Sequence, residues 1–185
     1  MEEMKEEAGQ RHRAESIRIN RLGQIDSAII RALEAAGINF ICSVTCALLS
    51  GVIDGISKRK SITHVPVTRE EEGVGICAGA FLGGAKPALF MQNSGLGNSI
   101  NALLSLTKLY HIDLLLVIGY RGRRGEEQIH AQIPMGTATT KLLTIIGAKY
   151  KIITRARDID SIKSAIKPGK GIRAVLLTPT VWEKV

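Results

Sequence analysis

Three consecutive carboxylates, Glu70, Glu71 and Glu72, are the part of this sequence best suited to chemistry. They follow an apolar segment that ends at Val67 and precede a segment rich in glycine and alanine. Thr68 and Glu71 have the spacing of a capping box, and Glu72 suits the positive end of a helix and solvent. Glu70 has no such structural role and is free to be a buried acid that does chemistry, which makes it our candidate catalytic residue. On composition alone, a tightly packed core helix with exposed acids at its start is modestly favoured.

Residues 92–98 form a second candidate segment. They contain two glycines and several hydrogen-bonding side chains, and the pattern predicts a turn between a strand and a helix. Backbone amides at a helix start are suited to hold an anion. An ordinary turn with Asn98 as the helix cap explains the same residues equally well.

A third candidate is the polar stretch 119–136, which is too long for a simple connection. Arg121 belongs to a residue type that pairs with carboxylates or sulfonates in bidentate geometry. His130 belongs to a type that transfers protons near neutral pH. A solvated loop is the alternative, and we prefer that interpretation for Arg123 and Arg124.

The apolar pattern predicts strands that alternate with helices. Apolar runs indicate strands over residues 39–44, 61–67, 88–91, 113–118, 149–153 and 173–177. Helical periodicity indicates helices over residues 25–33, 48–56, 69–82, 100–109, 137–146 and 158–166. Gly37 should end the first helix, and Thr45 should cap the second.

This order of elements predicts an α/β fold, a three-layer sandwich with a six-stranded, mainly parallel sheet and helices on both faces. We expect residues 1–20 to form an N-terminal arm and residues 21–185 to form one domain. Ligands of such folds bind beyond the carboxyl ends of the strands. The candidate segments follow strand ends, so residues 43–47, 67–73 and 92–98 should converge on one rim with the polar loop.

Composition and charge restrict the class of function. With 45% hydrophobic and 23% charged residues, the chain is typical of a soluble globular protein. Its apolar runs are far shorter than the roughly 20 residues of a membrane span, and its polar start differs from a signal peptide, so we expect a cytoplasmic location. The net charge of +8 suits an anionic substrate or an acidic partner. Aromatic residues make up only 4%, which argues against nucleic-acid binding.

Two apparent motifs lack the context that they need. Cys42 and Cys46 are four residues apart, but no second pair completes a zinc site, so we expect them and Cys77 to be buried thiols and predict no metal ligands. The run 73–78 matches a dinucleotide fingerprint. Its glycines begin inside the expected helix, however, and no acidic residue follows at the spacing that ribose binding requires.

Considered together, these segments resemble a known family. The run 68–79 resembles the pyrimidine-domain motif of thiamine-diphosphate enzymes, in which a Glu precedes a helical Gly by nine residues, as Glu70 precedes Gly79. Three further segments are similar to the decarboxylases of phosphonopyruvate and sulfopyruvate: 91–98, 120–127 and 131–136. The last of them is most similar to sulfopyruvate decarboxylase alpha subunits. The resemblance covers about residues 22–180.

The resemblance implies a pyrimidine-domain fold and a thiamine-diphosphate-dependent decarboxylase. Its reaction would convert 3-sulfopyruvate to sulfoacetaldehyde and carbon dioxide, on the route to coenzyme M. Glu70, shielded from water, would donate a proton to N1′ of the aminopyrimidine. Thr68 and Gly95 would contact the cofactor beside it. The resemblance also implies the residues that hold the substrate: Thr45, Asn93, Ser94, Arg121, His130 and Gln132.

The sequence contains no Gly-Asp-Gly motif, through which enzymes of this class bind the diphosphate and Mg²⁺ in a second domain. The resemblance therefore implies a separate beta subunit that carries this motif, active sites at the interface, and both homo- and hetero-oligomeric contacts. It implies no nucleic-acid or membrane partner.

The sequence departs from the family at two places. It has Ser-Val-Thr-Cys at 43–46, where the related decarboxylases tend to have Gly-Val-Pro-Cys. It has Ala131 and Gln132 where phosphonopyruvate enzymes have Gln-His, which favours sulfopyruvate as the substrate. A decarboxylase subunit for phosphonopyruvate or another 2-oxo acid remains open. A non-catalytic anion- or nucleotide-binding domain with a flavodoxin-like fold is the alternative of a different class.

Overall fold

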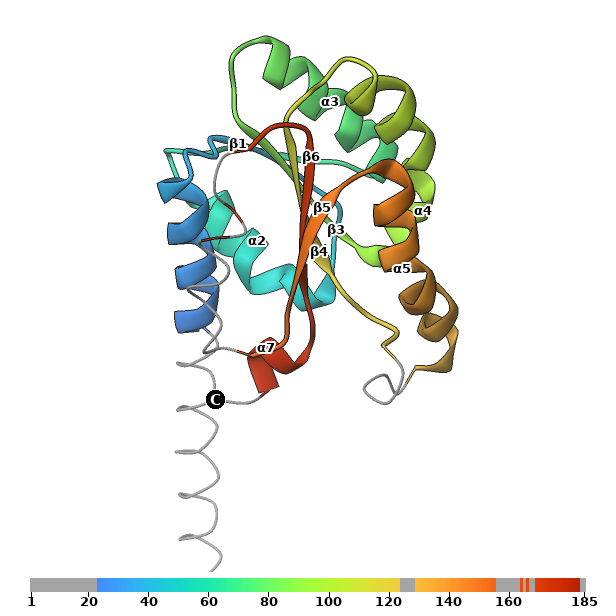
Figure 1. The fold of residues 1–185 in the computed structure, drawn as a ribbon. Coiled ribbons are helices and arrows are strands. Elements are labelled where there is room, and N and C mark those ends of the chain that lie inside the picture. The colour runs from blue at the N-terminus through green and yellow to red at the C-terminus, as the bar shows by residue number, and fades with distance from the viewer. Residues whose placement is uncertain (1–22, 124–128, 156–163, 165, 167–168, 184–185) are drawn as a thin grey trace, which may run out of the picture.

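The computed structural model describes residues 23–123, 129–155, 164, 166 and 169–183, which form an α/β fold in three layers (Figure 1). Its sheet has six strands in the order β2-β1-β3-β4-β6-β5, and every neighbouring pair is parallel. The strands are β1 Phe40–Ser43, β2 Thr63–Pro66, β3 Pro87–Gln92, β4 Leu114–Gly119, β5 Lys149–Ile153 and β6 Ile172–Leu177. The predicted fold class is confirmed, with an entirely parallel sheet. The expected arm over residues 1–20 and most of the expected helix over 158–166 lie outside the described residues.

The burial of each strand follows from its sequence. All six residues of β4 are buried, and so are the first five of β3, because these central strands are apolar on both faces. The outer strands β2 and β5 contain both polar and apolar residues, and most of their residues are exposed or half-buried. The continuous apolar runs therefore mark the centre of the sheet, and the mixed runs mark its edges.

Helices cover both faces of the sheet (Figure 1). On one face lie a helix over residues 23–35, the 3₁₀ turn η1, α2 and α7; on the other lie α3, α4, the π-helical η2 and α5. Their bounds are η1 Ala47–Leu49, α2 Ser50–Ser57, α3 Glu70–Leu82, α4 Asn93–Ala102, η2 Leu103–Lys108, η3 His130–Gln132, α5 Ile133–Ile146 and α7 Thr180–Glu183. None of the helices in the described ranges combines the length and the apolar character that crossing a bilayer requires.

Two apolar cores, one on each side of the sheet, result from the alternation of side chains along the strands. Ile41 and Phe90 point into the core beneath the helix over residues 23–35, whereas Cys42 and Leu89 point into the core beneath α3 and α4. Gly73 of α3 lies close to the sheet, since a Cβ there would approach the Leu89 side chain to 2.6 Å. Gly73 therefore serves the packing of α3 on the sheet, whereas a Cβ on Gly75 would meet nothing within 4 Å.

Two helices begin earlier than their sequences predict. α4 starts at Asn93, so residues 92–98 are not a turn, and Asn98 lies inside the helix rather than capping it. α5 starts at Ile133, within the expected polar loop, and Pro134 in its first turn suits a helix start. The cap predicted at Thr45 is also wrong, because Cys46 occupies the cap position of η1 and makes no side-chain cap bond.

The chain after β4 folds back tightly onto α5. The Tyr120 hydroxyl donates a hydrogen bond to the Gly136 carbonyl at 3.0 Å. Gly122 has a φ of +82°, and a Cβ on Gly136 would overlap the Gly122 backbone. Two glycines thus allow direct backbone contact, which fixes the first residues after β4 against the start of α5.

The variant Gly136→Ala tests this contact. Its Cβ would overlap backbone atoms, which cannot rotate away as a side chain could, and we expect a loss of about 2 kcal/mol or more in the free energy of unfolding. The matched control Gly75→Ala also lies inside a helix, but its Cβ meets nothing within 4 Å. This control should raise the free energy of unfolding, by about 1 kcal/mol at most. Urea denaturation measures both, and equal stabilities would contradict the contact.

Candidate active site

The carboxyl ends of the parallel strands bring the candidate segments to one edge of the sheet. Val67, after β2, donates a backbone hydrogen bond to the Ser43 carbonyl at 2.9 Å. Val44, after β1, donates one to the Phe90 carbonyl of β3, also at 2.9 Å. The segment after β4 joins them, because Gln92 is in register with Gly119. The predicted convergence on one rim is confirmed.

Glu70 lies in the first turn of α3 and packs against the start of α4. A Cβ on Gly95 would overlap the Glu70 side chain, so the acid occupies space that only a glycine leaves open. Asn98 Nδ2 donates a hydrogen bond to Glu70 Oε2 at 3.2 Å. Within the described residues Glu70 Oε1 has no hydrogen-bond partner. Glu70 is half-buried in this chain, less shielded from water than we expected from the sequence.

The two neighbouring acids have roles that differ from the predicted ones. Arg69, not Thr68, is the N-cap of α3. The acid three residues after this cap is Glu72, whose Oε2 accepts hydrogen bonds from Thr68 N and Thr68 Oγ1, both at 3.2 Å. Glu71 forms an ion pair with Arg69 at 2.5 Å. The predicted capping box of Thr68 and Glu71 is therefore wrong, because the helix begins one residue later than the sequence suggests.

Asn93 is fully buried at the first position of α4 and connects three segments. Its Nδ2 donates to the Arg121 carbonyl at 3.0 Å and to Thr139 Oγ1 at 2.9 Å. Its Oδ1 accepts from the Arg121 amide at 3.1 Å. Both amide hydrogens and the acceptor oxygen are thus used inside the chain. The side chain thus holds the Arg121 backbone in place, and the predicted contact of Asn93 with the substrate stays a prediction.

Ser94 and Gln132 are joined by Gln92, a residue that was not selected from the sequence. Gln92 Nε2 donates to Ser94 Oγ at 3.0 Å and to Gln132 Oε1 at 3.2 Å. Ser94 is exposed, and Gln132 is half-buried. The only sequence signal for Gln92 is a polar residue at the end of a buried strand, at the edge where ligands bind.

Arg121 lies near the segment that follows β1. Burial raises the pKa of the Cys46 thiol, and the positive charge of Arg121 acts against that shift. All three cysteines are buried free thiols, as expected. Thr45 and His130 are exposed, and in the described part of the chain neither bonds to another candidate residue. The structure thus brings Glu70 and Gly95 together, joins Ser94 of α4 to Gln132 through Gln92, and ties the Arg121 backbone to Asn93. Thr45 and His130 lie on segments of the same edge and bond none of the other candidate residues in the described part of the chain.

Metal ligands are absent from what the structure describes of this edge. Over residues 23–123, 129–155 and 169–183, no three His, Cys, Asp or Glu side chains lie close enough together to hold a metal ion.

Known proteins are similar to this chain in sequence and in fold. Residues 24–141 match the family described as thiamine pyrophosphate enzyme, N-terminal TPP binding domain. The chain is 53% identical to sulfopyruvate decarboxylase subunit alpha of Methanococcus maripaludis over 66% of this chain and 73% of that protein. This chain belongs to the thiamine pyrophosphate enzyme family. Within that family it belongs with the sulfopyruvate decarboxylase alpha subunits.

Two less similar relatives of this chain are longer proteins. Sulfopyruvate decarboxylase of Methanosarcina acetivorans is 32% identical over 85% of this chain and 41% of that protein. Phosphonopyruvate decarboxylase of Streptomyces viridochromogenes is 31% identical over 70% of this chain and 33% of that protein. The structure of a thiamine-diphosphate-dependent 4-hydroxybenzoylformate decarboxylase from Rhodococcus jostii superposes with a TM-score of 0.60 at 18% identity, over 85% of this chain and 30% of that one. This last likeness establishes the fold alone.

The variant Asn93→Ala tests the positioning role of this amide. Its removal leaves the Arg121 backbone groups and the Thr139 hydroxyl without their buried partner, and we expect the free energy of unfolding to fall by about 1–3 kcal/mol. The neighbouring change Ser94→Ala is exposed and should stay within about 0.5 kcal/mol of the parent chain. Chemical denaturation of both variants provides the measurement. A stable Asn93→Ala variant would show that the bonds to Arg121 and Thr139 are dispensable.

Proposed function

We propose that this chain is the alpha subunit of a thiamine-diphosphate-dependent decarboxylase that converts 3-sulfopyruvate to sulfoacetaldehyde and carbon dioxide. The observation that carries the proposal is Glu70, a carboxyl group held between Gly95 and Asn98 with one oxygen left for another partner. The similarity to alpha subunits that are named for this reaction supports the choice of substrate.

A separate beta subunit is part of the proposal, and it would bind the diphosphate and Mg²⁺. The chain spans most of the M. maripaludis alpha subunit but less than half of the M. acetivorans decarboxylase, whose name carries no subunit designation. The additional length of the second protein supports a requirement for a further domain, which a partner would supply here. The half-buried position of Glu70 fits an active site that such a partner completes.

The residues around Glu70 fit the pyrimidine end of thiamine diphosphate. Gly95 has no side chain, so the Glu70 side chain can pack directly against α4, and its Oε1 atom lacks a protein partner within the described residues. We assign Glu70 the transfer of a proton to N1′ of the aminopyrimidine, and Asn98 the orientation of that carboxyl. When bound, the cofactor supplies an electron sink for the pair released as carbon dioxide leaves. Thr68, whose hydroxyl bonds Glu72, stays a prediction as a cofactor contact.

The substrate 3-sulfopyruvate carries a carboxylate and a sulfonate, so its site needs positive charge and hydrogen-bond donors. Arg121 supplies a guanidinium with the bidentate geometry that such groups favour. Ser94 and Gln132, joined through Gln92, supply polar groups at the same edge. Asn93 contributes by fixing the Arg121 backbone. Contacts of Thr45 and His130 with the substrate stay predictions.

The variant Glu70→Gln, assembled with the beta subunit, tests the catalytic role. An amide has nearly the shape of the acid, and it cannot exchange a proton with the pyrimidine in the same way. We expect kcat to fall by about 100-fold or more. A coupled assay of sulfoacetaldehyde formation gives the rate.

Glu72→Gln is the matched control, since it makes the same chemical change two residues away, at an exposed acid that bonds Thr68. Its kcat should remain within about threefold of the parent enzyme, as expected for a surface substitution. If Glu70→Gln were as active as Glu72→Gln, the role of Glu70 would have to be abandoned.

Substrate preference is a separate prediction. In the assembled enzyme, kcat/KM for 3-sulfopyruvate should exceed that for phosphonopyruvate by at least about 10-fold, a difference of about 1.4 kcal/mol in transition-state binding. The phosphonate differs from the sulfonate in charge and protonation, and Gln132 stands where phosphonopyruvate enzymes have a histidine. Competing the two acids in one reaction gives the ratio directly. A ratio in favour of phosphonopyruvate would reassign the substrate and leave the role of Glu70 intact.

A further inference from the structure

A cavity of about 620 Å³ lies at the amino edge of the sheet, opposite the edge that carries Glu70. It is open to solvent on one side and is lined by the ends of α3, η2 and α5 and the start of β6. Its polar and charged lining residues are Thr107, Lys108, His111, Asp113 and Lys170. Its volume is within the range of small-molecule sites, about 300–1,000 Å³.

Positive charge predominates around this cavity. Lys108 and Lys170 line it together with His111, and Asp113 is the single acid among its lining residues. Asp113 Oδ1 accepts a hydrogen bond from the Gly171 amide at 2.5 Å. An anion entering the cavity would meet two ammonium groups and one carboxylate, so the charge of the lining is positive on balance.

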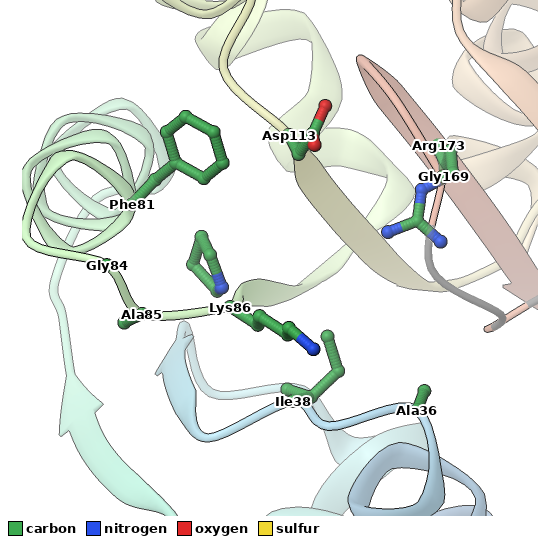
Figure 2. Close-up of a pocket in the computed structure, with 10 residues that line it drawn as sticks. Ala36, Ile38, Phe81, Gly84, Ala85, Lys86, Asp113, Gly169 and Arg173 are labelled. Atoms are coloured by element: carbon green, nitrogen blue, oxygen red, sulfur yellow. The ribbon is translucent and has the colours of Figure 1, made fainter.

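A neighbouring cavity of about 260 Å³ adds to this charge. Figure 2 shows it between Phe81 of α3 and Arg173 of β6, with Lys86 reaching into the same space. Burial lowers the pKa of Arg173, and the charge of Asp113 acts against that shift. Asp113 lines both cavities, and in each of them two Lys or Arg residues face this one acid.

Thr107 gives the independent sign of a ligand. It lines the larger cavity and is fully buried, and its Oγ1 has no hydrogen-bond partner in the described part of the chain. Other buried helical hydroxyls are paired: Thr139 Oγ1 donates to the Met135 carbonyl at 2.7 Å, and Ser99 Oγ to the Gly95 carbonyl at 2.8 Å. The π-helical turn that contains Thr107 differs from the α-helical geometry of those two. Buried polar groups are rarely left unpaired, so Thr107 lacks an oxygen that a ligand would bring.

A simpler role explains part of this charge. Lys108 Nζ lies 3.4 Å from the position of a Cβ on Gly147, the residue that ends α5, where a cation is favoured by the helix dipole. That role accounts for Lys108 alone. It explains neither the hydroxyl of Thr107 nor Lys170 across the cavity.

We propose that the larger cavity binds a small organic molecule with a phosphate or sulfonate group. Lys108 and Lys170 pair with the charged oxygens, and Thr107 donates its hydroxyl hydrogen to one of them. His111, held in a left-handed backbone conformation with φ of 54°, closes the wall beside them. This site is independent of the proposed decarboxylation, because it lies at the other edge of the sheet and includes none of the residues assigned to catalysis.

Titration of the full chain with glycerol 3-phosphate and, separately, with ethanesulfonate tests the proposal by calorimetry and NMR. We expect saturable binding with a Kd of about 1 mM or tighter for at least one probe, and amide shifts that centre on residues 107–113 and 170–172. The two probes distinguish a phosphate ligand from a sulfonate ligand. Neither the beta subunit nor the cofactor is needed, so this result and that for Glu70 can fail separately.

Three variants sharpen the test. Thr107→Val and Lys170→Met should each weaken binding by about 10-fold or more, the usual loss for a hydrogen bond to a charged group. Lys149→Met removes an equal charge from the start of β5, outside the lining of the cavity, and should change Kd by less than about twofold. In the ligand-free chain Thr107→Val should unfold at the same or a higher temperature, because no hydrogen bond is lost.

Three results would overturn the proposal. One is no saturable binding of either probe. Another is binding that Lys149→Met weakens as much as Lys170→Met does, since this would reflect net charge alone. The third is a loss of stability in ligand-free Thr107→Val as large as that of Thr139→Val, whose hydroxyl is already paired.

Discussion

The contact between Glu70 and Gly95 is the constraint on which the candidate active site depends. It requires α3 and α4 to pack side by side, closely enough that the acid of one helix fills the space left by the glycine of the other. Asn98, one turn further along α4, then bonds one oxygen of the carboxyl group. Two helices that follow different strands thereby hold one side chain, so its position depends on the whole sheet and not on a flexible loop.

The entirely parallel sheet separates two kinds of chemistry. Its carboxyl edge collects neutral hydrogen-bonding groups around Glu70 and Arg121, and much of their bonding capacity is used within the chain, as at Asn93 and Gln92. Its amino edge receives the C-terminal ends of helices and a set of basic side chains, including Lys108 and Lys170. Because helices and strands alternate in direction in such a fold, both edges follow from one topology.

The strands were largely predictable, and the helix starts were not. β5 has the bounds expected from its sequence, and the bounds of the other five strands lie within two residues of the expected ones. The reason is that a short, continuous apolar run is buried as a strand of a parallel sheet. The start of α4 depends on Asn93, whose bonds reach Arg121 and Thr139, distant in the sequence. A local pattern of glycines and amides could not reveal those partners, and it indicated a turn instead. The same limit applied to the acids after β2, where a shift of one residue gave Glu72 the bonds expected of Glu71.

The sequence by itself determined the fold class, because apolar periodicity along the chain sets the order of strands and helices. The resemblance of its motifs to known enzymes indicated the family and singled out Glu70. Only the tertiary structure decided which neighbours each polar group has. It showed Asn98 bonded to Glu70, Gln92 between Ser94 and Gln132, and Asn93 fully engaged. These hydrogen bonds join residues that are 28 to 46 positions apart, so no local sequence pattern could predict them. Whether a polar side chain serves a ligand or the fold is therefore settled by packing in three dimensions.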